Sequence, residues 1–332
     1  MSGFEGGSLG VLTTVAGNTA VVSTYARTGT YSLYIPTIAA NSHGQKNLGA
    51  GYNELYMRFG LRHNGTSIGA GGMIRLYDSG GTVQISLCVA ADGTLSVIRG
   101  TLTGGTVIVS GGVLPADEWH CVEWYAKIAD SGGRSIVKLD GTIVQDFTGD
   151  TRNAGVADIQ TIQFGANSTV QGVNFWADDV AINSTSGAVN NSYPGQGGIY
   201  GIVPSAAGNY TQLTPSAGDN YACVDEAPPN DATDYVGSAT TDKKDSYAMG
   251  NVTPTGGTVL AVNVLLRARL SEAGAGAIAR LLRIGSTDYQ GSDRNIDVSW
   301  TSYGEILETS PATAVAWTIA EVNGMEAGVV VR

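Results

Sequence analysis

The chain contains little of what a disulfide framework or a zinc site requires. It has three cysteines, Cys88, Cys121 and Cys223, which are odd in number, widely spaced and without a Cys-x-x-Cys pair. Neither a disulfide scaffold nor a structural zinc site has support in such a set. Cys88 and Cys121 stand inside apolar strand patterns, so we expect them to pack as small hydrophobic side chains.

Basic charge is also scarce. Lys and Arg together number 18 against 29 Asp and Glu, which gives a formal net charge of -11. Nucleic acid and anionic membranes are therefore not expected as partners, because both require a basic surface. No apolar run is long enough to cross a bilayer, and no basic segment followed by an apolar run opens the chain. We expect no membrane span and no signal peptide, and synthesis in a reducing cytoplasm.

What the chain does contain is strand and turn sequence. Hydrophobic residues make up 42% and glycine contributes 47 of 332 residues. Leu55, Met57, Phe59 and Leu61 alternate with polar residues, which predicts a half-buried strand. The same pattern recurs at 83–89 and 260–270. Asp-Gly pairs at 92–93 and 140–141 predict type I′ hairpin turns, because both central positions then need positive φ.

The pattern predicts an all-β chain of two antiparallel β-sandwich (jelly-roll) domains. A Gly/Ser/Pro-rich stretch separates them, so we expect domains at 1–185 and 209–332 and a linker at 186–208. Further strands are expected at 296–300, 315–322 and 328–331. The segment 272–284 is ambiguous between a short helix and a turn followed by a strand, and its two early glycines favour the turn and strand.

Several segments of the first domain, taken in order, resemble a known superfamily. They are Gly29-Thr30-Tyr31-Ser32-Leu33, Glu118-Trp119-His120-Cys121-Val122-Glu123-Trp124, the Asp140-Gly141 hairpin and Phe175-Trp176-Ala177-Asp178-Asp179-Val180-Ala181-Ile182. The ordered set resembles the concanavalin-A-like, laminin-G-like jelly-roll superfamily. The resemblance implies a β-sandwich of a kind that is frequent in phage particle proteins.

The second domain resembles a different group. Its segments are Asn220-Tyr221-Ala222-Cys223-Val224-Asp225-Glu226, Pro311-Ala312-Thr313-Ala314-Val315-Ala316-Trp317-Thr318 and Val322-Asn323-Gly324-Met325-Glu326-Ala327-Gly328-Val329. They are similar to a domain that recurs in structural proteins of tailed phages. The resemblance implies a jelly-roll-like module of a virion protein.

Four aromatic residues are candidates for the structural core: Trp119, Trp124, Trp317 and Tyr235. The alternative for the tryptophans is a ligand-stacking role. Asp178 and Asp179 are candidates for calcium binding, because carboxylates at the rim of this fold sometimes hold Ca²⁺. Calcium takes six or more oxygens, and no other run of ligands is evident, so structural hydrogen bonding by these aspartates is the favoured alternative.

Catalytic patterns are missing from the sequence. A glycosidase needs two carboxylates across the scissile bond, and no Glu-x-Asp-x-x-Glu run or similar pattern occurs. Residues 65–69 match G-x-S-x-G, but no helix signal follows them and no acid and histidine complete a triad. We therefore expect no enzyme and no cofactor.

The two resemblances, together with the missing catalytic patterns, imply a non-catalytic virion structural protein, specifically a capsid decoration or cement protein. Its expected partners are the major capsid protein or tail proteins, and a homo-oligomer, with a trimer favoured by particle symmetry. The alternative is a tail accessory or host-adhesion protein with a carbohydrate-binding β-sandwich. In that alternative, tyrosines such as Tyr193, Tyr200 and Tyr210 stack on surface glycans.

Overall fold

The computed structural model describes the chain except residues 37–41, 66–71 and 166–173. Most of the 65–69 motif therefore lies outside the described residues. The chain divides into two compact units, Met1–Ile199 (unit 1) and Tyr200–Arg332 (unit 2). The division falls inside the stretch expected as a linker. No helix in the described part of the chain is long and apolar enough to cross a membrane.

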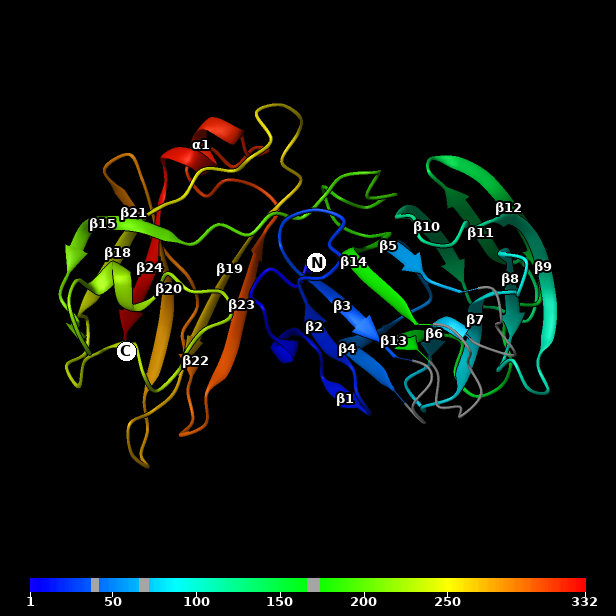
Figure 1. Cartoon of the computed structure of the whole chain (residues 1–332), viewed down its shortest axis with the longest axis horizontal. Helices are drawn as coiled ribbons and strands as arrows, with labels where there is room; N and C mark the ends of the chain where they lie inside the picture. The colour runs from blue at the N-terminus through cyan, green and yellow to red at the C-terminus, as the bar shows by residue number, and fades with distance from the viewer. Residues whose placement is uncertain (37–41, 66–71, 166–173) are drawn as a thin grey trace. The chain divides into compact units, whose positions relative to one another are not determined.

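Unit 1 is an antiparallel β-sandwich of two sheets (Figure 1). Sheet I has the strand order β1-β4-β13-β6-β7-β8-β9. Its strands are β1 (Thr14–Ala16), β4 (His43–Tyr52), β13 (Ile159–Gly165), β6 (Gly72–Tyr77), β7 (Val83–Val89), β8 (Thr94–Arg99) and β9 (Thr106–Val113). A 3-10 helix, η1 (Leu9–Val11), precedes β1.

Sheet II has the strand order β12-β11-β10-β5-β14-β3-β2. Its strands are β12 (Thr142–Gly149), β11 (Gly133–Leu139), β10 (His120–Lys127), β5 (Glu54–His63), β14 (Phe175–Ser184), β3 (Ser32–Ile35) and β2 (Ala20–Val22). The last strand of the unit, β14, lies between β3 and β5 in this sheet.

The core of unit 1 lies between the two sheets, where alternate side chains from each sheet meet. Phe59, Trp124 and Phe164 are among its largest fully buried or nearly fully buried members. The period-two prediction for β5 is confirmed, since Leu55, Met57, Phe59 and Leu61 all join the core. On β7 the prediction of a half-buried strand is wrong, because all seven residues are buried.

The two Asp-Gly turns have different geometries. At Asp140-Gly141 both residues have positive φ, as a type I′ turn requires. At Asp92-Gly93 only Gly93 does, and its N–H bonds to the Ala90 carbonyl. That is a type I turn followed by a left-handed glycine, so the type I′ prediction is wrong there although the hairpin is present.

Unit 2 is built on an antiparallel sheet in the order β15-β18-β24-β20-β21, with β22 also pairing to β20. The strands are β15 (Pro204–Thr211), β18 (Lys244–Met249), β24 (Glu326–Val331), β20 (Ala277–Ile284), β21 (Thr287–Gln290) and β22 (Arg294–Asn295). Two further ribbons pair β16 (Thr214–Pro215) with β17 (Val236–Gly237), and β19 (Val262–Ala268) with β23 (Thr301–Leu307). The two helices are η2 (Asn220–Cys223) and α1 (Ile319–Gly324).

The core of unit 2 joins the sheet, the β19–β23 ribbon and α1. Val264, Leu282, Trp317, Val322 and Met325 are buried together in it. The turn and strand favoured for 272–284 are confirmed by β20, and the strand at 328–331 lies within β24.

The other two strands expected in unit 2 are wrong. Residues 296–300 lie between β22 and β23, and residues 315–322 lead into α1. The Thr318 side chain accepts a hydrogen bond from the Glu321 N–H at 3.1 Å, which caps the helix. A Thr-x-x-Glu sequence is the signature of such a cap. The hydrophobic alternation of the same residues led to the prediction of a strand instead.

Two of the four core candidates are not core residues. Trp124 and Trp317 are buried, but Trp119 is only half-buried, in the connection before β10. Tyr235 is 45% exposed. It precedes the two-residue strand β17, which pairs only with β16 in the described structure, so no broad sheet covers its ring.

Candidate functional site

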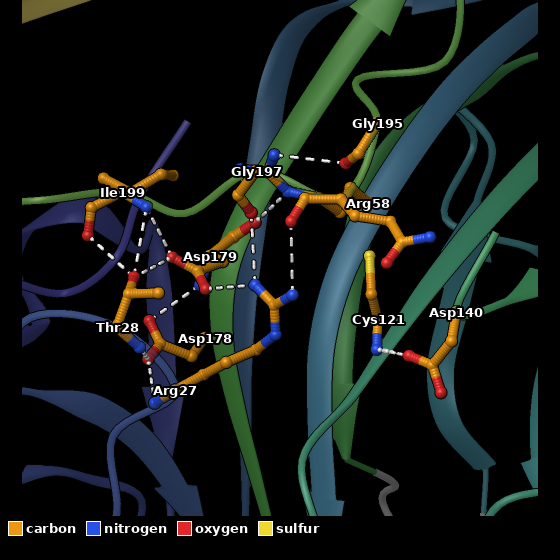
Figure 2. Close-up of polar contacts among 11 residues, drawn as sticks. Arg27, Thr28, Arg58, Cys121, Asp140, Asp178, Asp179, Gly195, Gly197 and Ile199 are labelled. Atoms are coloured by element: carbon orange, nitrogen blue, oxygen red, sulfur yellow. Dashed lines mark hydrogen bonds and ion pairs between the residues drawn. The ribbon is translucent and has the colours of Figure 1, made fainter. Parts of the chain in front are cut away.

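The two aspartates proposed from the sequence lie at a β-bulge in β14. The register between β14 and β5 shifts between Asp178 and Ala181, and Asp179 has a φ of 50°. A bulge redirects side chains locally. Ala177 and Val180 join the core, so both carboxyl groups lie on the outer side of sheet II, and they contact Arg27 and Thr28 (Figure 2). Both aspartates are fully buried.

Every carboxyl oxygen of this pair accepts a hydrogen bond from the protein. Asp178 Oδ1 accepts from the Asp179 N–H at 2.7 Å, and Asp178 Oδ2 accepts from the Arg27 N–H at 2.8 Å. Asp179 Oδ2 accepts from Arg27 Nη1 at 2.6 Å. Asp179 Oδ1 accepts from the Thr28 hydroxyl and from the Ile199 N–H, both at 2.6 Å.

A second charged pair lies beside the first on sheet II. Arg58 and Glu123 are cross-strand neighbours on β5 and β10, and both are buried. Arg58 Nε donates to the Asp179 carbonyl at 2.9 Å, and Glu123 Oε1 accepts from the Gly195 N–H at 2.8 Å. Arg27 Nη1 also donates to the Gly197 carbonyl at 3.1 Å (Figure 2). The charged cluster therefore holds residues 195–199, the last residues of unit 1, against sheet II.

Gly60 makes this arrangement sterically possible. A Cβ at Gly60 would lie 2.7 Å from Arg27 Cδ and 3.1 Å from the Asp178 carbonyl oxygen. Only a residue without a side chain lets Arg27 cross β5 to reach Asp179.

Burial raises the pKa of Asp178 to about 8, and the charge of Asp179 adds to the effect, while the three backbone N–H bonds oppose it. Burial also lowers the pKa of Arg58 and raises that of the neighbouring Cys121 thiol to about 11. Arg27 and Arg58 thus face the carboxyl groups of Asp178, Asp179 and Glu123, and burial favours the uncharged form of Asp178.

Asp178 and Asp179 make structural hydrogen bonds, the alternative that the sequence favoured for them, and their candidacy for calcium stays a prediction. Calcium needs six to eight oxygens, and the Arg27 guanidinium already supplies the positive charge at Asp179. Within the described residues, no group of three or more His, Cys, Asp or Glu is placed to hold a metal. The sequence pattern missed Arg27, Arg58 and Glu123. Their one sequence signal was Arg58 and Glu123 at outward positions of apolar strands.

A different feature of sheet II is an aromatic row on the same outer face. Tyr34 on β3, Trp176 on β14 and Arg62 on β5 are direct cross-strand neighbours. The Tyr34 and Trp176 rings are stacked, with centroids 5.0 Å apart. Tyr25 meets Trp176 edge-on, also at 5.0 Å. These four residues are called the aromatic row below.

Arg62 completes the aromatic row with a positive charge. Its Cζ lies 4.3 Å from the Tyr25 ring centroid and 5.9 Å from that of Trp176. An ion pair of 3.1 Å to Asp117 holds its other side. Tyr25 is 41% exposed, so the row presents a positioned aromatic ring at the surface.

The three tyrosines expected to stack on glycans are placed differently. Tyr193 packs edge-on against Tyr56 at 4.8 Å, and Lys138 Nζ lies 3.5 Å from its ring centroid. Tyr210 is half-buried on β15, beside Lys244 and Arg283. Tyr200 is exposed.

Comparison with known proteins gives structural likenesses only. No protein-family model matches the chain, and no curated protein matches it by sequence. An endo-β-1,4-glucuronan lyase from the fungus Trichoderma reesei is 17% identical with a TM-score of 0.41, over 54% of this chain and 93% of the lyase. The carbohydrate-binding module CBM66 from Bacillus subtilis is 12% identical with a TM-score of 0.35, over 52% of this chain and 96% of the module.

A third similar structure comes from a phage. It is described as a conserved carbohydrate esterase from the Shiga toxin-encoding bacteriophage phi24B, with 14% identity and a TM-score of 0.37, over 50% of this chain and 87% of the esterase. Because a lyase and an esterase stand among the similar structures, the prediction that this chain is not an enzyme is withdrawn. A β-sandwich of this kind does not exclude catalysis.

Proposed function

We propose that unit 1 binds glycans through the aromatic row, and that the protein serves host adhesion or another surface role on a phage particle. The observation that carries the proposal is the cross-strand alignment of Tyr34, Trp176 and Arg62, with exposed Tyr25 set against them. Aromatic rings with a polar edge suit surfaces that must contact both the apolar faces and the hydroxyls of a sugar.

Rigidity is the second argument for this site. The Tyr25 carbonyl accepts a hydrogen bond from the Ser32 hydroxyl, and Arg62 and Trp176 hold the Tyr25 ring from two directions. A ring that is already ordered loses little conformational entropy on binding. Tyr, Trp and Arg are also the residue types that most often dominate binding energy at interfaces.

The test is glycan-array screening of the full chain followed by calorimetry on the strongest ligand. Tyr25→Ala is expected to weaken binding about tenfold or more, the loss of about 1.4 kcal/mol that a stacking ring supplies. Tyr235→Ala is the matched control, because Tyr235 is 45% exposed and lies in unit 2. Equal losses in the two variants, or no binding by the wild type, would refute the proposal.

The same samples test for catalysis. Release of new reducing ends or of acyl groups from a bound glycan would show an enzyme, and glycan binding without products would show a binding module. The location on a particle, as capsid decoration or tail protein, and the trimeric state stay predictions from the sequence resemblance. Quantitative mass spectrometry of purified virions measures the copy number that separates a decorated shell from a tail tip.

A further inference from the structure

The outer face of sheet I carries a buried arginine for which the described part of the chain supplies no polar partner. Arg75 on β6 is 6% exposed, and its Nε is buried without a hydrogen bond. Arg62 and Arg280 also have a buried, unbonded Nε, but ion pairs to Asp117 and Glu305 hold their guanidinium groups. For Arg75, no hydrogen bond or ion pair is found among the described residues.

The polar neighbours of Arg75 make their hydrogen bonds to other groups. Gln163 stands directly across on β13, but its Oε1 already accepts from Gln45 Nε2 at 2.7 Å and from the Tyr77 hydroxyl at 3.0 Å. Ser86 stands across on β7, and its hydroxyl donates to the Gly100 carbonyl at 2.9 Å. Both residues are fully buried.

The nearest carboxylate along the chain is also engaged elsewhere. Asp78 follows β6 and is buried. Its Oδ1 accepts from the Thr82 N–H at 2.7 Å, and its Oδ2 accepts from Gln84 Nε2 at 3.0 Å and from the Val156 N–H at 2.8 Å. Asp78 therefore holds the turns at the end of the sheet rather than neutralising Arg75.

A buried guanidinium N–H without an acceptor is costly, because burial removes hydration that no protein group replaces. A guanidinium has a planar set of donors that matches a carboxylate in a two-pronged contact. The surrounding polar groups of Gln45, Gln163, Tyr77 and Ser86 are already fixed by one another or by the backbone. The face is thus preorganised around one unsatisfied donor group.

We propose that the outer face of sheet I binds a carboxylate-bearing ligand, such as a uronate sugar, with the Arg75 guanidinium as the group that receives the carboxylate. The site is separate from the aromatic row, since it lies on the other sheet. It stands even if the aromatic row binds no glycan.

The test measures binding of sodium glucuronate to the full chain by calorimetry and by the shift in melting temperature. Glucose and sodium sulfate at matched ionic strength are the comparison ligands. Wild type is expected to bind glucuronate and not glucose, and Arg75→Met is expected to weaken glucuronate binding about tenfold or more. Arg75→Lys, which keeps the charge but loses the planar fork, should also bind more weakly than the wild type.

Two controls separate this proposal from others. Arg134→Met removes an exposed arginine that is paired with Asp146 on sheet II, and it should leave glucuronate binding unchanged. Tyr25→Ala should also leave it unchanged, which distinguishes the two sites. Absence of glucuronate binding by the wild type, a response to sulfate alone, or equal binding by Arg75→Met would overturn the proposal.

Discussion

Both outer faces of unit 1 contain buried arginines, and the two faces differ in whether these arginines have hydrogen-bond partners. On sheet II, Arg27 and Arg58 are surrounded by Asp178, Asp179 and Glu123, and almost every polar atom has a partner. On sheet I, Arg75 is buried and its Nε has no hydrogen-bond partner among the described residues. A buried structural cluster is stable when all of its hydrogen-bonding groups have partners. A donor without a partner, held among ordered side chains, can instead bond to an acceptor on a ligand. The comparison assigns a structural role to the charged cluster of sheet II and a ligand-binding role to Arg75 of sheet I.

Removing Asp179 is expected to have the largest effect on stability. In Asp179→Ala, Arg27 and the Ile199 N–H lose their acceptor in a buried place. The free energy of unfolding of unit 1 should fall by about 3–5 kcal/mol, as when one partner of a buried pair is removed. Urea unfolding that resolves the two units measures it.

The matched control for that variant is Asp146→Ala. Asp146 pairs with Arg134 on the same sheet, but both side chains are 45% exposed, so the loss should stay within about 0–1 kcal/mol. If both variants lose the same amount, the cluster around Asp179 has no special structural role.

Arg75→Met should have a smaller effect of the opposite sign. Replacing a buried, unpaired charge by an apolar side chain of similar length is expected to raise the free energy of unfolding by about 1–3 kcal/mol in the absence of ligand. Thermal unfolding without added anion measures the change. A loss of stability comparable to that of Asp179→Ala would mean that Arg75 is a structural residue, which removes the contrast between the faces.

The pH dependence of the stability of unit 1 tests the charged cluster of sheet II. The pKa of Asp178 is raised from its ordinary value of 3.8 to about 8, so folding favours its protonated form. This contribution is fully present below pH 3.8 and is lost as pH rises through about 8. The stability difference between wild type and Asp178→Asn should therefore fall across that window, by up to about 1.4 kcal/mol per pH unit for one proton.

Asp178→Asn itself is expected to lower stability at every pH, because both oxygens of Asp178 accept backbone N–H groups and an amide nitrogen cannot. Only the slope against pH tests the raised pKa. A wild-type curve parallel to that of the variant between pH 4 and 8 would show that Asp178 is ionised throughout in the folded state.

Local sequence patterns predicted the strands well where one side of a strand meets the core. On β5, the alternate residues Leu55, Met57, Phe59 and Leu61 all join the core as predicted, and the Asp140-Gly141 turn follows its dipeptide. The predictions failed where tertiary partners decide. Val315–Val322 has strand-like alternation, yet it ends in a capped helix, and Tyr235 has a core-like side chain with little sheet against it.

The candidate site was predicted only in part. The sequence drew attention to Asp178 and Asp179 but could not name Arg27 or Ile199 as their partners, which lie 152 and 20 residues away from Asp179. It gave no reason to single out Arg75. An outward arginine on a strand looks the same in sequence whether or not an acceptor faces it, because that acceptor comes from another strand.

The sequence by itself determined that this chain is all-β, because alternation with period two and Asp-Gly turns are local properties of neighbouring residues. Only the tertiary structure decided which charges are satisfied and which aromatic rings align. Those properties depend on register between strands that are distant in the chain, such as β14 beside both β3 and β5. A shift of one residue in that register would place Trp176 on the core side of the sheet, and the residues of the aromatic row would no longer be aligned.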